Sequence, residues 1–392
     1  MEGNLDNLEH LIEPKEKKKF LIAIIIIVLL FVLLASVSIL YALGVGWKDK
    51  DKDKDIDKDI DKDKKESEKP TESILSLWNK DAESTKNLIS YMKAVTDINN
   101  EKFIPPGNRI AVFDFDGTIF TETVPIYFDY YMFSYRVLED PDYKDKATDE
   151  EKKIATDIKN ADIFKLPGYL QMAHAKAYPH AFENMTFEQL EEYTKDYMQK
   201  ESPKFNNMKR GEGFFEPMVE IVNYLQANDF KVFICSGGDR HIYRTLARSR
   251  LNLPEGHIKG TYSSVSASGQ TNRSDSSYEF KRDDELIMGG EFKYKNVRMN
   301  KVSLIKTEIG KQPVLSFGNS AGDYSMAKYV TSHNKYDSRA FMILCDDLVR
   351  EYGNEEEANK IKKKCDENAN WVSVSMKNDW IKIYPDKVSK KN

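Results

Sequence analysis

The sequence predicts an α/β fold in which a doubly wound, mainly parallel sheet of the Rossmann-like type carries a helical insertion and follows a transmembrane helix. Short apolar runs alternate with segments of helical periodicity from about residue 72 onward, which is the pattern of βαβ units. Three of these runs end in polar or acidic residues, at positions 114, 236 and 319, as expected where strands open onto a ligand crevice. A long uncharged stretch near the N-terminus predicts the transmembrane helix.

The uncharged stretch covers residues 20–47 and is rich in Ile, Leu and Val. It exceeds the roughly 20 residues that a helix needs to cross a bilayer. Four lysines precede it, whereas Lys and Asp alternate after it, so the positive-inside rule places residues 1–19 in the cytoplasm. A cleaved signal peptide is the alternative, but the apolar core is long for one, which favours an uncleaved anchor. We therefore predict a single-pass membrane protein whose folded part is extracytoplasmic.

Charged residues are numerous but balanced. The chain has 59 Lys and Arg against 64 Asp and Glu, which gives a formal net charge of -5. Such a balance gives no steering field for polyanions, so we expect no nucleic-acid partner. Lys and Asp alternate densely in residues 48–70, and this stretch has almost nothing to bury. It is therefore predicted to be a tether.

Cysteine usage does not indicate a fold held by disulfides, because the chain has only three cysteines. Cys235 lies in an apolar run and is most simply a core residue. Cys345 and Cys365 either form a disulfide or remain free, since their spacing does not determine the distance between their Cα atoms.

The folded part is predicted to be a core interrupted by a cap. Helical spacing of apolar residues predicts one or two helices within residues 72–95. Strands are predicted at residues 110–113, 231–235, 313–317, 340–345 and 371–376. Between the first two strands, residues 121–215 have helical spacing and no strong strand signal, which predicts a helical cap where a lid would lie. The core domain would then comprise residues 71–120 and 216–392.

Three further segments complete the predicted core. Helices are expected at residues 217–228 and 301–310, and Gly310 ends the second of them. Residues 262–295 are polar, with few periodic apolar positions. We predict hairpins or loops there and expect little chemistry from them.

Two carboxylates end the first predicted strand. Asp114 and Asp116 follow the apolar run 110–113 and are followed by Gly117 and Thr118. At the crevice of an α/β sheet the first acid could attack a bound group while the second approaches from the side, and Gly117 would let the backbone come close. The alternative interpretation is a polar turn, in which Asp and Gly are ordinary residues.

Three other groups of candidate residues follow along the chain. Ser236 and Gly237 stand between a strand and a helix, where N–H groups and a hydroxyl can bind an anion, although a plain turn is the alternative. Lys301 begins a predicted helix, and Asn319 and Asp323 follow the third buried strand. Chance is a poor explanation for all of these groups in this order.

The four groups resemble the motifs of haloacid dehalogenase (HAD) superfamily phosphatases. Those motifs are D-x-D-G-T, a Ser or Thr at a strand end, a Lys, and a G-D/N-x-x-x-D run, which matches residues 318–323 here. The sequence is most similar to a bacterial, phosphoserine-phosphatase-like branch, over about residues 78–384. The predicted membrane helix and tether fall outside this likeness.

The resemblance implies catalytic roles that the chemistry supports. Asp114 would be a nucleophile that forms an aspartyl-phosphate, which splits one difficult displacement into two easier ones. Asp116 would protonate the leaving oxygen and then deprotonate water. Lys301 would hold phosphate oxygens and assist catalysis. Lys306 competes with it for this role, and we choose Lys301 because it begins the helix and matches the family position.

The resemblance also implies a metal site and a phosphate site. Mg²⁺ would lie between the Asp114 carboxylate, the Asp116 backbone carbonyl, Asp323 and the phosphate. The implied phosphate-binding residues are Thr118, Ser236, Gly237 and Lys301. Asn319 stands where many relatives have Asp, and we interpret it as a residue that orients its neighbours.

The sequence therefore predicts a membrane-anchored, Mg²⁺-dependent phosphatase whose partner is a small phosphorylated metabolite. A phosphotransferase with the same residues and a catalytically inactive surface binding protein are the alternatives. An inactive domain usually lacks a motif residue, and none is missing here. The identity of the substrate does not follow from the sequence, because specificity would be set by the cap, where no sequence motif indicates a substrate.

Overall fold

The structure is a computed structural model that describes residues 75–123 and 126–391. The predicted cytoplasmic segment 1–19, transmembrane helix 20–47 and tether 48–70 lie outside these residues. Among the described helices, none is long and apolar enough to cross a membrane. The predicted single-pass localisation and membrane partner are corrected by this finding, because no described helix supplies the span that they require.

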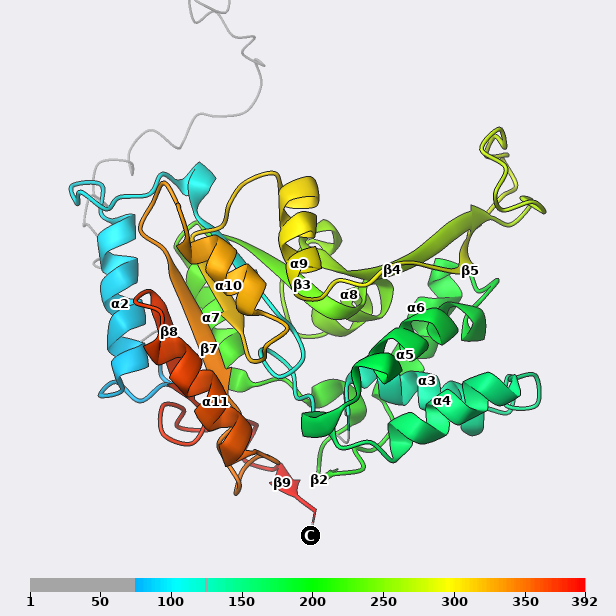
Figure 1. The fold of residues 1–392 in the computed structure, drawn as a ribbon, viewed down its shortest axis with the longest axis horizontal. Helices are drawn as coiled ribbons and strands as arrows, with labels where there is room; N and C mark the ends of the chain where they lie inside the picture. Colours follow the sequence, from blue (N-terminus) through cyan, green and yellow to red (C-terminus); the bar gives the residue numbers. More distant parts are fainter. Residues whose placement is uncertain (1–74, 124–125, 392) are drawn as a thin grey trace, which may run out of the picture. The chain divides into compact units, whose positions relative to one another are not determined.

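A seven-stranded sheet forms the centre of the domain (Figure 1). In spatial order its strands are β5 (Leu286–Tyr294), β4 (Ile258–Ala267), β3 (Lys231–Asp239), β1 (Ile110–Phe113), β6 (Leu315–Gly318), β7 (Arg339–Leu344) and β8 (Trp371–Ser375). All neighbouring strands are parallel except β4 and β5. The predicted mainly parallel α/β sheet is confirmed, and β5 adds an antiparallel edge to it.

The strand order reverses at β1. The chain runs outward from β1 through β3 and β4 to β5, then crosses to β6 and continues through β7 to β8. Every residue of β1 is buried, and Val112 lies opposite Phe233 of β3 and Ser316 of β6. In open α/β sheets, ligands bind outside the carboxyl ends of the strands at such a reversal. The residues that follow β1 and β6 are therefore placed at the crevice.

Helices cover both faces of the sheet. Phe113 of β1 packs in one apolar cluster with α2 and α7, whereas Val112 packs in another with α9 and α10. The core helices are α2 (Glu83–Thr96), α7 (Glu216–Ala227), α8 (Arg240–Arg248), α9 (Met299–Leu304), α10 (Tyr324–Thr331) and α11 (Glu355–Asp366). The alternation of side chains along a strand thus produces the two helical layers of a doubly wound fold.

Four helices are inserted between β1 and α7. They are α3 (Phe128–Leu138), α4 (Asp149–Lys159), α5 (Gly168–Ala181) and α6 (Phe187–Met198). Capping boxes begin two of them, formed by Thr148 with Glu151 in α4 and by Thr186 with Gln189 in α6. Helices α3, α4 and α5 pack on one another, and α6 packs on α8 of the core. These four helices are called the cap below, and their function as a lid stays a prediction.

A long antiparallel arm joins the cap to the core. It consists of β4 and β5, which extend from the sheet toward the cap helices (Figure 1). Strand β5 packs against α5 and α6, and Ile287 forms an isolated bridge with Thr186 at the start of α6. The polar stretch 262–295 thus contains a hairpin, as predicted. The returning strand brings residues 295–298 to the crevice.

Short elements complete the described chain. They are β2 (Phe205–Asn206), β9 (Ser389–Lys390), η1 (Pro106–Asn108), η2 (Ile163–Lys165), η3 (Arg210–Glu212), η4 (Glu255–His257) and the π-helical turn η5 (Ile305–Ile309). Gly310 ends this turn in a left-handed conformation.

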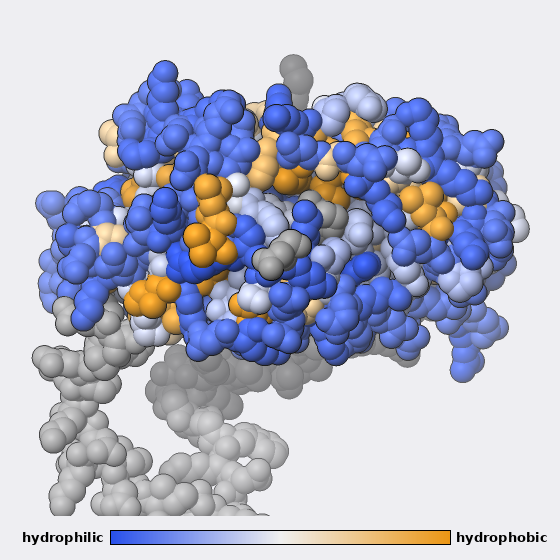
Figure 2. Space-filling model, turned by 90° about the horizontal axis from the view of Figure 1, so that it is seen from below, coloured by the Kyte–Doolittle hydropathy of each residue, from blue (hydrophilic) through white to orange (hydrophobic). Residues whose placement is uncertain are grey.

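All three cysteines are free, so Cys345 and Cys365 do not pair, and Cys235 is a buried core residue as predicted. The face in Figure 2 is mostly hydrophilic, with small apolar patches.

Candidate active site

Asp114 stands directly after β1, and the chain then leaves the strand in a tight turn. The backbone N–H of Asp114 donates to the carbonyl of Phe317 in β6 (2.9 Å), which fixes the end of this strand pair. Gly117 has a φ of +73°, and a Cβ added there would lie 1.9 Å from Nδ2 of Asn319. Only glycine meets both requirements. The turn therefore places Asp114 and Asp116 together at the crevice.

Lys301 joins two acids of the candidate site. Its Nζ donates to Oδ1 of Asp114 (2.6 Å) and to Oδ1 of Asp323 (2.7 Å). Lys301 is only 2% exposed, whereas Lys306, the alternative from the sequence, is exposed. Burial removes the competition from water that weakens surface ion pairs. The structure thus brings Asp114, Lys301 and Asp323 together and leaves Lys306 outside the cluster.

The loop after β6 holds Asp323 and Asn319 in different ways. Oδ2 of Asp323 accepts from the backbone N–H groups of Asn319 (3.1 Å) and Ser320 (3.2 Å). The Asn319 side chain donates from Nδ2 to Glu122 (2.9 Å) and accepts at Oδ1 from the Thr118 hydroxyl (3.3 Å). Asn319 therefore links three segments of the crevice. Thr118 is fully buried and does not line the cavity, so its hydroxyl holds Asn319 in this arrangement.

Asp116 is hydrogen-bonded through one of its two oxygens. The Tyr243 hydroxyl, from α8, donates to Oδ2 (2.5 Å) and lies 3.4 Å from Oδ1 of Asp129 on α3. Oδ1 of Asp116 is buried and has no hydrogen-bond partner in the part of the chain that the structure describes. Among the described residues, Asp116 is therefore held at one oxygen, and its other oxygen is buried without a partner.

The segment around Ser236 is more enclosed than a free anion-binding loop. Ser236 is fully buried, and its hydroxyl accepts from the N–H of Gly238 (3.0 Å). Gly237 lines the cavity, and its carbonyl accepts from the Thr261 hydroxyl (2.6 Å) and from Nζ of Lys295 (2.9 Å). Gly237 can therefore meet a ligand directly. Phosphate binding by Ser236 and Gly237 stays a prediction.

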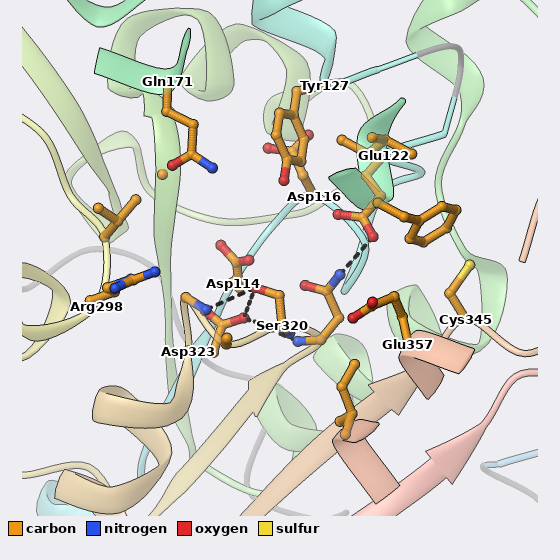
Figure 3. Close-up of a pocket in the computed structure, with 18 of the residues that line it drawn as sticks. Asp114, Asp116, Glu122, Tyr127, Gln171, Arg298, Ser320, Asp323, Cys345 and Glu357 are labelled. Carbon is orange, nitrogen blue, oxygen red and sulfur yellow. Dashed lines mark hydrogen bonds between the residues drawn. The ribbon is translucent and has the colours of Figure 1, made fainter. Parts of the chain in front are cut away.

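A cavity of about 400 Å³ lies between the strand ends and the cap. Tyr127, Gln171 and Arg298 line it and point toward the space around Asp114 (Figure 3). These three are called the rim side chains below. Within residues 75–123 and 126–391, no hydrogen bond or ion pair joins a rim side chain to another residue. The rim is therefore free to bind a ligand.

Burial and mutual repulsion raise the pKa values of the acids in the cavity. Burial, together with repulsion from Asp323, raises the pKa of Asp114 to about 6, although Lys301 opposes this. Burial and repulsion from Asp129 raise the pKa of Asp116 well above its usual value. The pKa of Lys301 is also raised, because Asp114 and Asp323 outweigh the effect of burial. The cavity therefore contains more acidic side chains than the charge of Lys301 can neutralise.

Two carboxylates of the candidate site could hold the Mg²⁺ that the resemblance implies. Asp114 and Asp323 provide hard carboxylate oxygens beside one another, held through a shared lysine. Mg²⁺ is usually bound by one or two carboxylates together with substrate oxygens and water. Among the described residues, no group of three or more His, Cys, Asp or Glu side chains could hold a metal by itself. The residues fit a magnesium ion that takes its remaining ligands from substrate and water.

Several residues of the site were not found from the sequence. Tyr243 and Asp129 lie in helices, where their spacing resembles that of core and surface positions. Glu122 is buried beside Asn319, and its only signal was an acid shortly after the D-x-D-G-T motif. Lys295 is buried against Gly237 and lines the cavity, although it comes from the stretch expected to contribute little chemistry. Its position depends on the return of the β4–β5 arm, which has no sequence motif.

The comparisons with known proteins found similar structures only. No family model matches the chain, and no curated protein matches it. A conserved protein of unknown function from Anaerococcus prevotii is 16% identical, with a TM-score of 0.46, over 75% of this chain and 92% of that one. Cytosolic 5'-nucleotidase IIIB bound to cytidine is 14% identical, with a TM-score of 0.44, over 77% and 88%.

A third similar structure is a phosphoserine phosphohydrolase-like protein from Francisella tularensis. It is 15% identical, with a TM-score of 0.33, over 64% of this chain and 92% of that chain. A HAD-family hydrolase from Salmonella enterica and a phosphoserine phosphatase complex are also among the similar structures, each with 14% identity and a TM-score of 0.32.

Proposed function

We propose that this protein is a Mg²⁺-dependent phosphatase that hydrolyses phosphomonoesters through an aspartyl-phosphate on Asp114. The observation that carries the proposal is the contact of Nζ of Lys301 with both Asp114 (2.6 Å) and Asp323 (2.7 Å) at the reversal of strand order. A buried carboxylate held by a buried lysine at a ligand crevice is an oriented nucleophile, whereas a surface ion pair would have no such direction.

In the first step, a carboxylate oxygen of Asp114 attacks phosphorus, and the bond to the leaving oxygen breaks. Asp116 gives its proton to that oxygen, which leaves as an alcohol. Lys301 fixes the attacking carboxylate and places positive charge beside the transferring group. Gly237 contacts the phosphate from the end of β3.

In the second step, water attacks the phosphorus of the aspartyl-phosphate and regenerates the Asp114 carboxylate. Asp116, now ionised, takes a proton from that water and returns to its starting state. One residue thus serves as acid and then as base. The net reaction consumes one water and releases an alcohol and phosphate.

Magnesium would be held by the Asp114 carboxylate, the backbone carbonyl of Asp116, and Asp323. When bound, it would neutralise charge on the transferring phosphoryl group. Asn319 would orient this region through its bonds to Glu122 and Thr118. Its amide carries no charge, so it would leave the excess of acid beside the metal unchanged.

The substrate would be a small phosphorylated metabolite. A cavity of about 400 Å³ suits a compact molecule. The phosphate would lie over Asp114, and the rest of the molecule would reach the rim side chains Tyr127, Gln171 and Arg298. A guanidinium without a protein partner can pair with an anionic group on the substrate.

Hydrolysis by the purified full chain tests this function. A panel of phosphorylated metabolites should include compounds that release phosphate when Mg²⁺ is present, and EDTA should stop the release until Mg²⁺ is restored. No release from any member of the panel, or release that EDTA does not affect, would contradict the proposal. Added alcohols test the phosphotransferase alternative, which predicts phosphorylated alcohols in place of free phosphate.

A further inference from the structure

Asp116 meets a hydroxyl group that the four sequence motifs do not include. We infer that Tyr243 is a positioning residue for Asp116, whose hydroxyl holds Oδ2 and so fixes the carboxyl group that delivers the proton to the leaving oxygen. This inference rests on the proposed phosphatase function. It adds a residue from α8 that acts through Asp116 and does not touch the reacting atoms.

The two oxygens of Asp116 are in different environments. Oδ2 accepts from Tyr243 at 2.5 Å, whereas Oδ1 is buried without a partner in the described part of the chain. The bond from Tyr243 therefore fixes the carboxyl group of Asp116 at Oδ2, and Asp116 lines the cavity where the substrate would lie.

The ring of Tyr243 has little freedom to place its hydroxyl elsewhere. Tyr243 is fully buried, and its ring meets the edge of Phe115 with centroids 4.9 Å apart and planes at 87°. Its hydroxyl has one proton and lies nearer to Asp116 (2.5 Å) than to Asp129 (3.4 Å). The Tyr243 hydroxyl therefore donates its proton in the hydrogen bond to Asp116.

Gly238 makes room for this ring. A Cβ added at Gly238 would lie 2.1 Å from Cε2 of Tyr243 and 2.9 Å from its hydroxyl oxygen. Any other residue would therefore push the ring away or move the end of β3. Both glycines after Ser236 line the cavity, and Gly238 in addition admits the tyrosine ring.

The same hydrogen bond serves both chemical steps. In the first step the proton of the Asp116 carboxyl group moves to the leaving oxygen, and Asp116 becomes a carboxylate. The Tyr243 hydroxyl keeps its own proton and donates to Oδ2 more strongly, because a carboxylate is the better acceptor. In the second step this carboxylate takes a proton from water, and the starting arrangement returns.

A purely structural role for Tyr243 predicts a different kinetic result. A structural defect lowers turnover of every substrate alike. A defect in proton delivery matters most when the leaving alcohol is a poor leaving group, and it matters least for nitrophenolate, which departs without a proton. The value of kcat/KM reports this first step.

The test compares an alkyl phosphate with p-nitrophenyl phosphate in the full chain. For Tyr243→Phe we expect kcat/KM for the alkyl ester to fall about 10²-fold, the cost of misplacing a catalytic group by about 1 Å, with little change for the nitrophenyl ester. Gly238→Ala should give the same pattern through displacement of the ring. The melting temperature of each variant reports whether it is folded.

Two matched variants serve as controls. Tyr224→Phe removes the hydroxyl of another buried tyrosine, on α7 and outside the cavity lining, and Gly256→Ala adds a methyl group where no atom lies within 4 Å. Both should behave as wild type. Equal losses on the two esters, or no loss on either, in folded Tyr243→Phe would overturn the inference while leaving the phosphatase intact. Wild-type protein that hydrolyses no phosphomonoester would instead overturn the proposed function.

Discussion

The strand ends and the rim of the cavity differ in how their polar groups are satisfied. At the strand ends, Asp114, Lys301 and Asp323 are bonded to one another and buried. At the rim, Tyr127 and Arg298 point into the same cavity without a hydrogen-bond partner among the described residues (Figure 3). Polar groups that are fixed before the substrate binds are suited to catalysis. Polar groups without a protein partner are suited to substrate recognition. The two regions should therefore respond differently to substitution.

The largest effect is expected at the nucleophile. Asp114→Asn keeps the size of the side chain but removes its charge, so kcat should fall by at least about 10³-fold. The matched control is Asp386→Asn, because that aspartate is exposed and far from the strand ends in sequence. Phosphate release by the two folded variants provides the comparison. Substantial activity in Asp114→Asn would show that the strand ends do not carry the chemistry.

The second largest effect is expected at Lys301, for which Lys306 was the alternative in the sequence. Lys301→Met leaves Asp114 and Asp323 buried without their cation, so kcat/KM should fall about 10²-fold. The unfolding free energy should fall by about 3–5 kcal/mol, because two buried charges lose their partner. Lys306→Met alters an exposed side chain and should change neither quantity. Similar losses in the two variants would contradict the assignment of Lys301.

The smallest effect is expected at the rim. Arg298 should act on binding, so Arg298→Ala should raise KM for an anionic substrate about tenfold, the effect of one charged hydrogen bond, with little change in kcat. A fall in kcat without a change in KM would place Arg298 with the strand-end residues.

The backbone of Arg298 adds a second comparison at the rim. Its φ of 54° and ψ of −124° are unfavourable for any residue with a Cβ. Its N–H donates to the carbonyl of Gly322 (3.0 Å), which holds the backbone in this conformation. Arg298→Gly should therefore be more stable than Arg298→Ala by about 1 kcal/mol, with the same rise in KM. Equal unfolding free energies of the two variants would show that the conformation is not strained.

The sequence predicted the strand ends far better than the rim. Asp114 follows a run of apolar residues that only a buried strand explains, and Asn319 and Asp323 follow another, so local pattern was sufficient there. The choice of Lys301 over Lys306 rested on sequence position, and burial now separates them. Arg298 and Lys295 depend on the return of the β4–β5 arm, which is a long-range event. No periodicity in residues 262–295 encodes it.

Tyr243 illustrates a second reason why the sequence did not predict every residue of the candidate site. A tyrosine among the apolar positions of a short helix is normally a core residue, and most of its ring does pack in the core. Only its hydroxyl reaches the site, because Gly238 lacks a side chain. The predicted membrane location rested on residues 20–47, outside the described chain, and no described helix supplies it.

The covalent intermediate on Asp114 is the central claim, and trapping it tests that claim most directly. Asp116→Asn should still accept phosphate from p-nitrophenyl phosphate, whose leaving group needs no proton, but should hydrolyse the phosphoenzyme slowly. After an acid quench, mass spectrometry should find one phosphate per chain on Asp114, and none when Asp114→Asn is added to this variant. Phosphate on another residue, or product release by the wild type with no covalent phosphate at any time, would contradict the account.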